Sequence, residues 1–580
     1  MTGSSPEHAG PGRQSRAEPT SRAELDRSLT VLAESARSFA RSPVAEKAAW
    51  VRQILGRYYE LCPRMVADAC HVKGVAEGSP LEGEEWFAGP LVTLRSLRQL
   101  AVSLDQIAKR GAPELAAERV RPRAGGGVAV RTVPHDRADG VLFTPYASEA
   151  WLDARADAQE LAASQASFYQ RREPEGRVVL VLGAGNVASI PILDAIYKLF
   201  VEGSVCLLKM SPVNDYLGAS FELACAPLIE RGFLRICYGG AEVGAYLCGH
   251  ELVQEIHMTG SAETHDAIVW GPAGPEREAR KRAGTPLLQK TVTSELGNVS
   301  PVLVVPGSYS EVEIEVMARG IAGMVTQNAS FNCNAAKMLI VPKGSLRDSL
   351  LGELRTVLSG ITPRKAYYPG AEARYRALTT DAPRVETFGA AGAGELPWTL
   401  VSELDAASAA PQFRQEPFCS IVSEVAVGGE DPLEFLDAAV QFANEKLWGT
   451  LNAMLYVSPA LERDPSVAPR LERALDELRY GTVAVNQWPA ASYALATPPW
   501  GGHPSATLSD VQSGIGWVHN TLFLEHVEKT VQRGPLRAFP TPMYFPGHRK
   551  LRELGRALCD FEMRPNAWNL ARIAAAATRA

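Results

Sequence analysis

Four short apolar runs that alternate with helical segments constrain this fold more than any other feature of the sequence. The runs lie between residues 177 and 258 and read VVLVL, SVCLLKM, LRICY and EIHM. The stretches between them, such as residues 191–200, carry apolar residues at helical spacing. Strands that alternate with helices of this length form βαβ units around a parallel sheet. Because helices cover both faces of such a sheet, a run like VVLVL needs no polar alternation.

A second alternating block begins at residue 301 with PVLVV and continues through KMLIV, CSIVSEVAV and LNAMLYV. A helical segment near residues 346–359 lies between the second and third of these runs. The simplest architecture that accommodates both blocks is of the α/β class, with two doubly wound lobes and a cleft between them.

The remaining segments are less regular. Residues 1–28 lack the apolar core of a secretory signal peptide, and we expect them to be a disordered N-terminal segment. The pattern of residues 29–110 is helical, residues 119–147 have the short alternating runs of a hairpin excursion, and a helix is expected over 148–169. The chain ends in a proline-rich and then basic stretch, residues 533–580. Its HRKLRELGRAL segment predicts an amphipathic helix that either docks on its own subunit or touches a membrane or partner.

Composition excludes several classes of protein. The chain of 580 residues has 46% hydrophobic and 21% charged residues, which is an ordinary composition for a globular protein. Its net charge of −6 gives no excess of basic residues for binding nucleic acid. The nine cysteines contain no CxxC pair, which favours reduced thiols over zinc-ribbon or thioredoxin-like sites. No uncharged stretch resembles a membrane span. We expect a cytoplasmic protein with no integral membrane segment, no nucleic-acid partner and no metal site.

The turn LGAGNVA places Gly183, Gly185 and Ala188 between a strand and a helix, as in a GxGxxA dinucleotide fingerprint. That fingerprint requires an acidic residue at the end of the next strand, where this sequence has Lys209. The simple fingerprint is therefore disfavoured, and a tight strand-to-helix turn explains the glycines equally well.

Six short segments carry a stronger signal because they occur in one order. They are GAGNVASIP, LLKMSP, IHMTGSAET, SELGNVSP, NASFNCNAAK and QEPF. The ordered set resembles the aldehyde dehydrogenase superfamily and identifies the chain as a divergent member of it over about residues 29–532. The resemblance implies an NAD(P)-binding Rossmann-like domain over 29–297, a catalytic domain over 298–500, a return segment with an oligomerisation strand over 501–532, and a C-terminal extension over 533–580.

The resemblance assigns three catalytic residues. Cys333 alone would be read as a small buried hydrophobe, but its asparagine neighbours and the NxGQxCxA alignment make it the catalytic thiol. A thiolate attacks an aldehyde carbon readily and forms a thioester that water can cleave. Glu295 is implied as the general base for that water, since a half-buried carboxylate has a pKa raised towards neutrality. Asn186 is implied as an oxyanion donor, together with the backbone N–H of Cys333.

The same resemblance implies contacts to an NAD or NADP cofactor. The ribose, adenine, pyrophosphate and nicotinamide contacts fall on Lys209, Gly244, Thr259, Gly260, Ser261, Glu416 and Phe418. Many NAD-preferring members have a glutamate where this chain has Pro212, so NADP is also expected to fit. For two of these residues an explanation without a ligand remains open. Lys209 could be a surface lysine whose methylene groups lie on apolar neighbours, and Ser261 could cap a helix that binds no ligand.

Departures from the family pattern concentrate near the substrate and the nicotinamide. Ser330 and Phe331 stand where Gly-Gln is usual, Asn298 replaces a glycine, and His265 stands where glycine is common. These differences affect the prediction of which aldehyde binds more than the prediction of the reaction type.

The predicted activity is NAD(P)-dependent oxidation of a small-molecule aldehyde to a carboxylic acid through a cysteine thiohemiacetal and thioester. Two alternatives remain open: a coenzyme A-acylating aldehyde dehydrogenase or acyl reductase, and a non-enzymatic scaffold. Members of the family usually dimerise or tetramerise by adding a strand of one subunit to another's sheet. A homodimer or homotetramer is therefore expected, formed through a small β element drawn from residues 127–181 and a late strand near 526–532.

Overall fold

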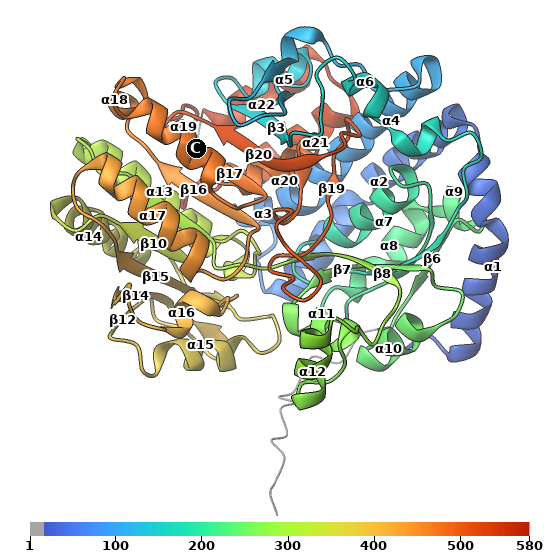
Figure 1. The fold of residues 1–580 in the computed structure, drawn as a ribbon, viewed down its shortest axis with the longest axis horizontal. Coiled ribbons are helices and arrows are strands. Elements are labelled where there is room, and N and C mark those ends of the chain that lie inside the picture. Colours follow the sequence, from blue (N-terminus) through green and yellow to red (C-terminus); the bar gives the residue numbers. More distant parts are fainter. Residues whose placement is uncertain (1–16, 579–580) are drawn as a thin grey trace, which may run out of the picture.

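The first lobe of the computed structural model, which describes residues 17–578, is built on a five-stranded parallel sheet in the order β6-β5-β4-β7-β8 (Figure 1). The strands are β4 (Val178–Leu182), β5 (Val205–Lys209), β6 (Leu234–Cys237), β7 (Glu255–Gly260) and β8 (Thr291–Leu296). The first four coincide with the four apolar runs that predicted a parallel sheet. Most of their residues are buried, as expected where helices cover both faces.

Helices surround this sheet, and two of them, α1 (Arg22–Arg41) and α11 (Ala262–Val269), begin at a serine side-chain cap. The others are α2 (Val44–Lys73), α7 (Ile190–Phe200), α8 (Gly218–Ala224), α9 (Ala226–Ile229), α10 (Ala241–Gly249) and α12 (Pro275–Ala283). A capping box between Ser21 and Glu24 starts α1 at Arg22. The expectation of disorder up to residue 28 is therefore wrong for residues 22–28, while residues 1–16 of that N-terminal segment lie outside the described residues.

The second lobe has an eleven-stranded sheet in the order β1-β2-β3-β20-β17-β16-β9-β10-β15-β14-β12. Its strands are β1 (Val120–Pro122), β2 (Val128–Val133), β3 (Ala147–Leu152), β9 (Pro301–Val304), β10 (Met338–Val341), β12 (Arg384–Phe388), β14 (Trp398–Leu404), β15 (Ile421–Ala426), β16 (Asn452–Tyr456), β17 (Thr482–Val485) and β20 (Val527–Arg533). Strands β20 to β14 are parallel, and antiparallel pairs complete both ends. The architecture is thus two α/β lobes with a small β element, as predicted.

The helix expected over 148–169 is wrong. Strand β3 occupies Ala147–Leu152, and only the short helix α6 (Leu161–Ser164) and a 3₁₀ turn follow it. Ala150 pairs with Val130 on one side and Thr530 on the other. These two neighbours come from distant parts of the chain, so long-range pairing overrides the local pattern here.

Strand β20 pairs inside its own chain. It lies parallel to β17, with Val531 opposite Val483, and antiparallel to β3, with Gln532 opposite Ser148. This is the late strand that the resemblance assigned to subunit contact, and here it closes the sheet of its own subunit. The oligomeric state stays a prediction.

The C-terminal extension docks on its own chain. Helix α21 (Leu551–Met563) packs on α3 (Glu82–Trp86) and α4 (Val92–Arg110), and α22 (Ala567–Ala577) follows it. The approach is so close that a Cβ on Gly83 would lie 2.5 Å from the backbone carbon of Leu551. Within residues 17–578, no helix is both long enough and apolar enough to cross a membrane.

Candidate active site

Sheet register brings several of the predicted residues to one edge of the first lobe. Leu182, the last residue of β4, is opposite both Lys209 and Met258. Thr259, the next residue of β7, is opposite Glu295 of β8. Because these strands are parallel, their carboxyl ends share the edge at which open α/β sheets hold ligands.

Cys333 lies in the loop between α13 (Glu311–Thr326) and β10, and a buried lysine holds this loop. Lys337 Nζ donates to the carbonyl oxygen of Cys333 at 2.8 Å and to that of Asn298 at 3.0 Å. The same ammonium is paired with the Glu416 carboxylate. Sequence reasoning missed Lys337, although a lysine directly before the apolar strand MLIV was a usable signal.

The backbone before Cys333 is strained. Asn328, Ala329 and Ser330 all have left-handed φ values, of 52°, 53° and 69°. The Asn328 side chain stabilises the turn, because its Nδ2 donates to the carbonyl oxygens of Asn186 and Phe331, both at 3.0 Å. Ser330 stands where the family pattern has glycine. Because Ser330 has a Cβ, its left-handed φ has a conformational cost that glycine would not have.

Replacing Ser330 with glycine is expected to stabilise the protein by about 1 kcal/mol, because glycine adopts left-handed φ without steric penalty. The measurement is the denaturant midpoint of unfolding. Ser349→Gly is the matched control: this exposed serine lies within α14 (Ser345–Ser359), where glycine should cost about 0.5–1 kcal/mol. A Ser330→Gly protein that loses as much stability as the control would contradict the assignment of strain.

Glu295 is a buried carboxylate, and one of its two oxygens accepts a hydrogen bond. Its Oε2 accepts a hydrogen bond of 2.8 Å from Trp500 Nε1, and its Oε1 has no hydrogen-bond partner among the described residues. Burial and, as the second largest cause, the negative charge of Asp194 together raise the pKa of Glu295 to about 7. A carboxyl group with this pKa can gain and lose a proton at neutral pH, as a general base must.

The Cys333 thiol lies beside the Glu295 carboxylate. Burial raises the pKa of this thiol well above its usual value, and the Glu295 charge adds to that effect while Lys337 opposes it. The sulfur is therefore protonated at neutral pH, and the neighbouring carboxylate is placed to accept its proton.

Asn186 lies against the Cys333 segment. The side-chain Nδ2 donates a hydrogen bond to the Phe331 carbonyl oxygen at 3.0 Å. The backbone carbonyl oxygen of Asn186 accepts hydrogen bonds from Lys73 Nζ and Tyr367 Oη. A side-chain amide has two N–H donors, so one of them is available for a further acceptor. The three catalytic candidates, far apart in the sequence, thus meet in one place.

Asp194 is a second buried carboxylate near Glu295, and the sequence analysis did not single it out. It lies on α7, and its Oδ2 accepts from Thr259 Oγ1 at 2.8 Å, with His257 Nε2 at 3.5 Å. Its charge is the second largest cause of the raised Glu295 pKa, after burial.

Asp194→Asn is expected to lower the pKa of Glu295. If Glu295 acts as a base, turnover rises with pH through about 7 in the wild type, because the carboxylate must be ionised. The rising limb should move to lower pH in the variant, since a neutral amide no longer disfavours that ionisation. The measurement is the pH dependence of kcat. Asp381→Asn, an exposed acid in the second lobe, should leave the limb in place, and an upward move in Asp194→Asn would refute the electrostatic link.

Two of the predicted cofactor residues lie next to each other. A Cβ on Gly244 would lie 3.7 Å from Lys209 Cε, so the backbone of α10 approaches this lysine closely. Lys209 Nζ donates to the Met210 carbonyl oxygen at 3.2 Å, which leaves further ammonium donors for a ligand. Ser261 caps α11, with its Oγ accepting from Thr264 N, and Gly260 beside it is exposed.

Glu416 and Phe418 lie on the Cys333 side of the site. A Cβ on Gly297 would lie 1.7 Å from Glu416 Oε2, so any larger residue at this position would displace the Glu416 carboxylate. Burial raises the pKa of Glu416, and the paired Lys337 opposes this. The Phe418 ring lies 5.9 Å from the Phe331 ring, centroid to centroid.

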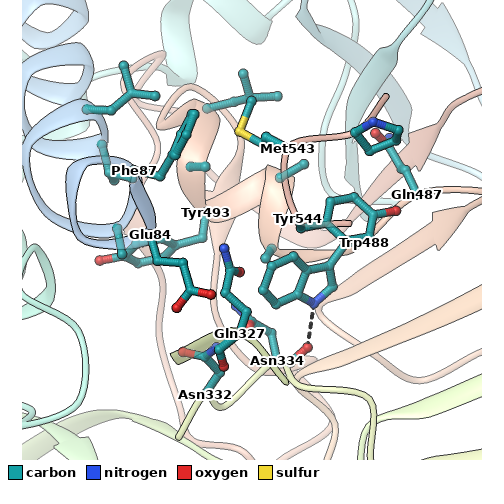
Figure 2. A pocket seen from close by; sticks show the side chains of 18 of the residues that line it. Glu84, Phe87, Gln327, Asn332, Asn334, Gln487, Trp488, Tyr493, Met543 and Tyr544 are labelled. Carbon is teal, nitrogen blue, oxygen red and sulfur yellow. Dashed lines mark hydrogen bonds between the residues drawn. The ribbon is translucent and has the colours of Figure 1, made fainter. Parts of the chain in front are cut away.

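A cavity of about 250 Å³ reaches Cys333. Figure 2 shows its side chains, with Gln327, Asn332 and Asn334 gathered at one end and Phe87 and Met543 at the other. The site therefore combines a sulfur nucleophile, a buried base and an apolar cavity.

Comparison with known proteins places the chain in a family. A sequence model described as the aldehyde dehydrogenase family matches residues 127–366. The 4-trimethylaminobutyraldehyde dehydrogenase A of Danio rerio is 28% identical over 178 residues, which are 30% of this chain and 31% of that protein. The hydroxyisobutyraldehyde dehydrogenase of Mycolicibacterium austroafricanum is 24% identical over 343 residues, 58% of this chain and 63% of that protein. Residues 127–366 of the chain therefore belong to the aldehyde dehydrogenase family.

The matches in sequence span about a third of the Danio rerio enzyme and under two thirds of the Mycolicibacterium enzyme. The fold match is more extensive. The glyceraldehyde-3-phosphate dehydrogenase of Methanocaldococcus jannaschii, solved with NADP, has a TM-score of 0.58 at 13% identity, covering 89% of this chain and 95% of that one. The fold of that enzyme is therefore matched over most of this chain, while the sequence similarity to known enzymes is concentrated in part of it.

Proposed function

We propose that this protein oxidises an aldehyde to a carboxylic acid with NAD or NADP. The observation that carries the proposal is the Cys333 thiol at the cavity beside the buried Glu295 carboxyl group, whose pKa is about 7. The match of residues 127–366 to the aldehyde dehydrogenase family supports the reaction class.

In the first half of the reaction, the Cys333 sulfur forms a bond to the aldehyde carbon while its proton passes to Glu295. The resulting oxyanion accepts hydrogen bonds from the spare Asn186 N–H and the Cys333 backbone N–H. One such donor is worth about 3 kcal/mol in the transition state. The bound nicotinamide supplies the acceptor for the hydride. Cys333 then holds the acyl group as a thioester, and Glu295 releases its proton to solvent.

In the second half, Glu295 takes a proton from a water molecule, whose oxygen forms a bond to the acyl carbon. The carbon–sulfur bond breaks, Glu295 returns the proton to the sulfur, and the acid leaves. Lys337 fixes the position of the Cys333 loop throughout. Trp500 orients the base, because its N–H binds the oxygen that does not face the reaction.

The residues present fit an NAD or NADP cofactor. Lys209 has spare donors for ribose hydroxyls, Gly244 allows a close approach of backbone beside it, and the start of α11 at Gly260 and Ser261 exposes N–H groups suited to a pyrophosphate. The structural neighbour solved with NADP supports this assignment. Thr259, Glu416 and Phe418 are proposed to contact the nicotinamide side of the same cofactor.

Two further proposals concern the cellular form of the enzyme. All nine cysteines are free thiols, eight of them buried, which supports a reducing compartment such as the cytoplasm. A homodimer or homotetramer is proposed from the superfamily, although the late strand β20 is used within its own subunit.

The test is the formation of reduced nicotinamide from a panel of aldehydes with each cofactor, with and without coenzyme A. The proposal expects turnover without coenzyme A and a free carboxylic acid as product. Strict dependence on coenzyme A would identify the acylating alternative instead. No turnover of any aldehyde would favour the non-enzymatic scaffold.

A further inference from the structure

The C-terminal extension forms one wall of the cavity that reaches Cys333. Its contribution includes aliphatic, thioether and aromatic side chains, from Leu536, Met543, Tyr544, Phe545 and Leu558. Much of the remaining apolar lining comes from the helices α3 to α4 and from the segment after β17, including Phe87, Trp488 and Tyr493 (Figure 2). A ligand bound to Cys333 would therefore extend towards residues outside the part of the chain that resembles the superfamily.

Two acids in the lining are neutralised by buried partners. Glu84 accepts a hydrogen bond from Arg364 Nη1 at 2.6 Å. Glu85 is paired with Lys73 at 2.8 Å, and both side chains of this pair are almost fully buried. Neither acid is left to bind a cationic substrate group.

The other two charged residues of the lining are also paired with each other and with neighbours. Arg95 donates to Asp139 at 2.7 Å and to Glu562 at 3.1 Å, and Arg98 donates to Glu562 at 2.6 Å. Glu562 belongs to α21, so the extension supplies part of this network. A substrate carboxylate, phosphate or ammonium would enter the cavity without a counter-charge, which is strongly unfavourable.

Polarity changes along the cavity. Gln327, Asn332 and Asn334 gather at the end near Cys333, where Trp488 Nε1 donates to the Asn334 carbonyl oxygen at 2.7 Å (Figure 2). The other end is apolar, with Phe87 and Met543 facing each other across it. This arrangement suits a ligand with a polar carbonyl head and a hydrocarbon tail.

The wall is fixed by close packing. The Tyr544 ring lies 5.3 Å from the Trp488 ring, centroid to centroid. A Cβ on Gly323 of α13 would lie 2.2 Å from the Tyr544 carbonyl oxygen, so the extension presses directly on this helix. The cavity boundary is therefore part of the folded core.

We propose that the C-terminal extension forms the part of the cavity wall that determines which aldehydes bind. The substrate is an uncharged aldehyde with an apolar tail. The inference rests on the proposed function and names its substrate class. An apolar cavity of about 150 Å³ accommodates benzene, so the 250 Å³ here has room for an aromatic ring with a short chain or for a medium-length alkyl chain.

The first experiment measures kcat/KM for the straight-chain aldehydes from propanal to decanal. The value should rise about fourfold per methylene until the cavity is filled and then level off or fall. Butanal and succinic semialdehyde, which differ by one carboxylate, give the charge test, and butanal should be at least about 100-fold better. A flat series, or a preference for succinic semialdehyde, would overturn the inference and leave the proposed function standing.

The second experiment tests the wall itself. Met543→Ala should move the preferred chain length upwards, and Met543→Trp should move it downwards, since the tail of the substrate ends near this side chain. Phe539→Ala is the control, because Phe539 lies in the same stretch but is 80% exposed. The readout is the octanal-to-propanal ratio of kcat/KM. Equal ratios in all three variants and the wild type would overturn the inference.

A binding measurement separates failure of the inference from failure of the proposed function. Nonanamide, an uncharged amide with an alkyl tail, should protect Cys333 from alkylation by iodoacetamide, and Met543→Trp should abolish that protection. Protection without turnover of any aldehyde would reject the proposed function and support the apolar cavity. Absence of protection in the wild type would overturn the inference whatever the turnover.

Discussion

Glu295→Gln should strongly slow aldehyde oxidation in both halves of the reaction. Loss of a general base costs about 10²–10⁴ in rate. Glutamine has nearly the same volume, and its side-chain oxygen can keep the hydrogen bond from Trp500, so the fold should be retained. An amide can take a proton neither from the Cys333 thiol nor from water, so both the attack of the sulfur on the aldehyde and the hydrolysis of the thioester should slow.

The measurement is a rapid-mixing experiment that follows reduced nicotinamide. The expected result is a first turnover and a steady-state rate that are both reduced about 10²–10⁴-fold. Glu251→Gln, an exposed acid of the same lobe, is the control. Wild-type steady-state turnover in Glu295→Gln would remove Glu295 from the mechanism.

Cys333→Ala should abolish turnover altogether. Removing a catalytic nucleophile costs about 10⁶-fold in enzymes where it has been measured, and here neither the thiohemiacetal nor the thioester can form without sulfur. Little loss of stability is expected, because Cys333 is only partly buried at the cavity.

Oxidation of octanal is the readout, together with a test for a covalent acyl-enzyme by mass spectrometry. Cys62→Ala is the matched control, since this buried thiol of α2 lies outside the site and should leave turnover unchanged. If the Cys333→Ala protein oxidised any aldehyde at the wild-type rate, the covalent mechanism would be wrong.

The site was partly predictable because its residues end or follow strands that are themselves easy to recognise. Lys209 and Glu295 lie at the ends of β5 and β8, and Asn186 follows β4. Asp194 and Lys337 were missed for a physical reason. Each is polar within an apolar segment, and its importance comes from a charge or carbonyl oxygen on a different element.

The sequence by itself determined the two α/β lobes, the parallel strands of both, and the order of the segments that carry Asn186, Glu295 and Cys333. Hydrophobic periodicity and strand-to-helix turns are local properties, so they can be read along the chain.

Only the tertiary structure decided three other features: the pairing of β20 within its own subunit, the raised pKa of Glu295, and the cavity wall formed by the C-terminal extension. Each depends on segments that lie about a hundred or more residues apart, as in the pairing of β20 with β3 and the contact of Arg95 with Glu562. Burial and electrostatic coupling exist only once such segments have packed together, so no local pattern could reveal them.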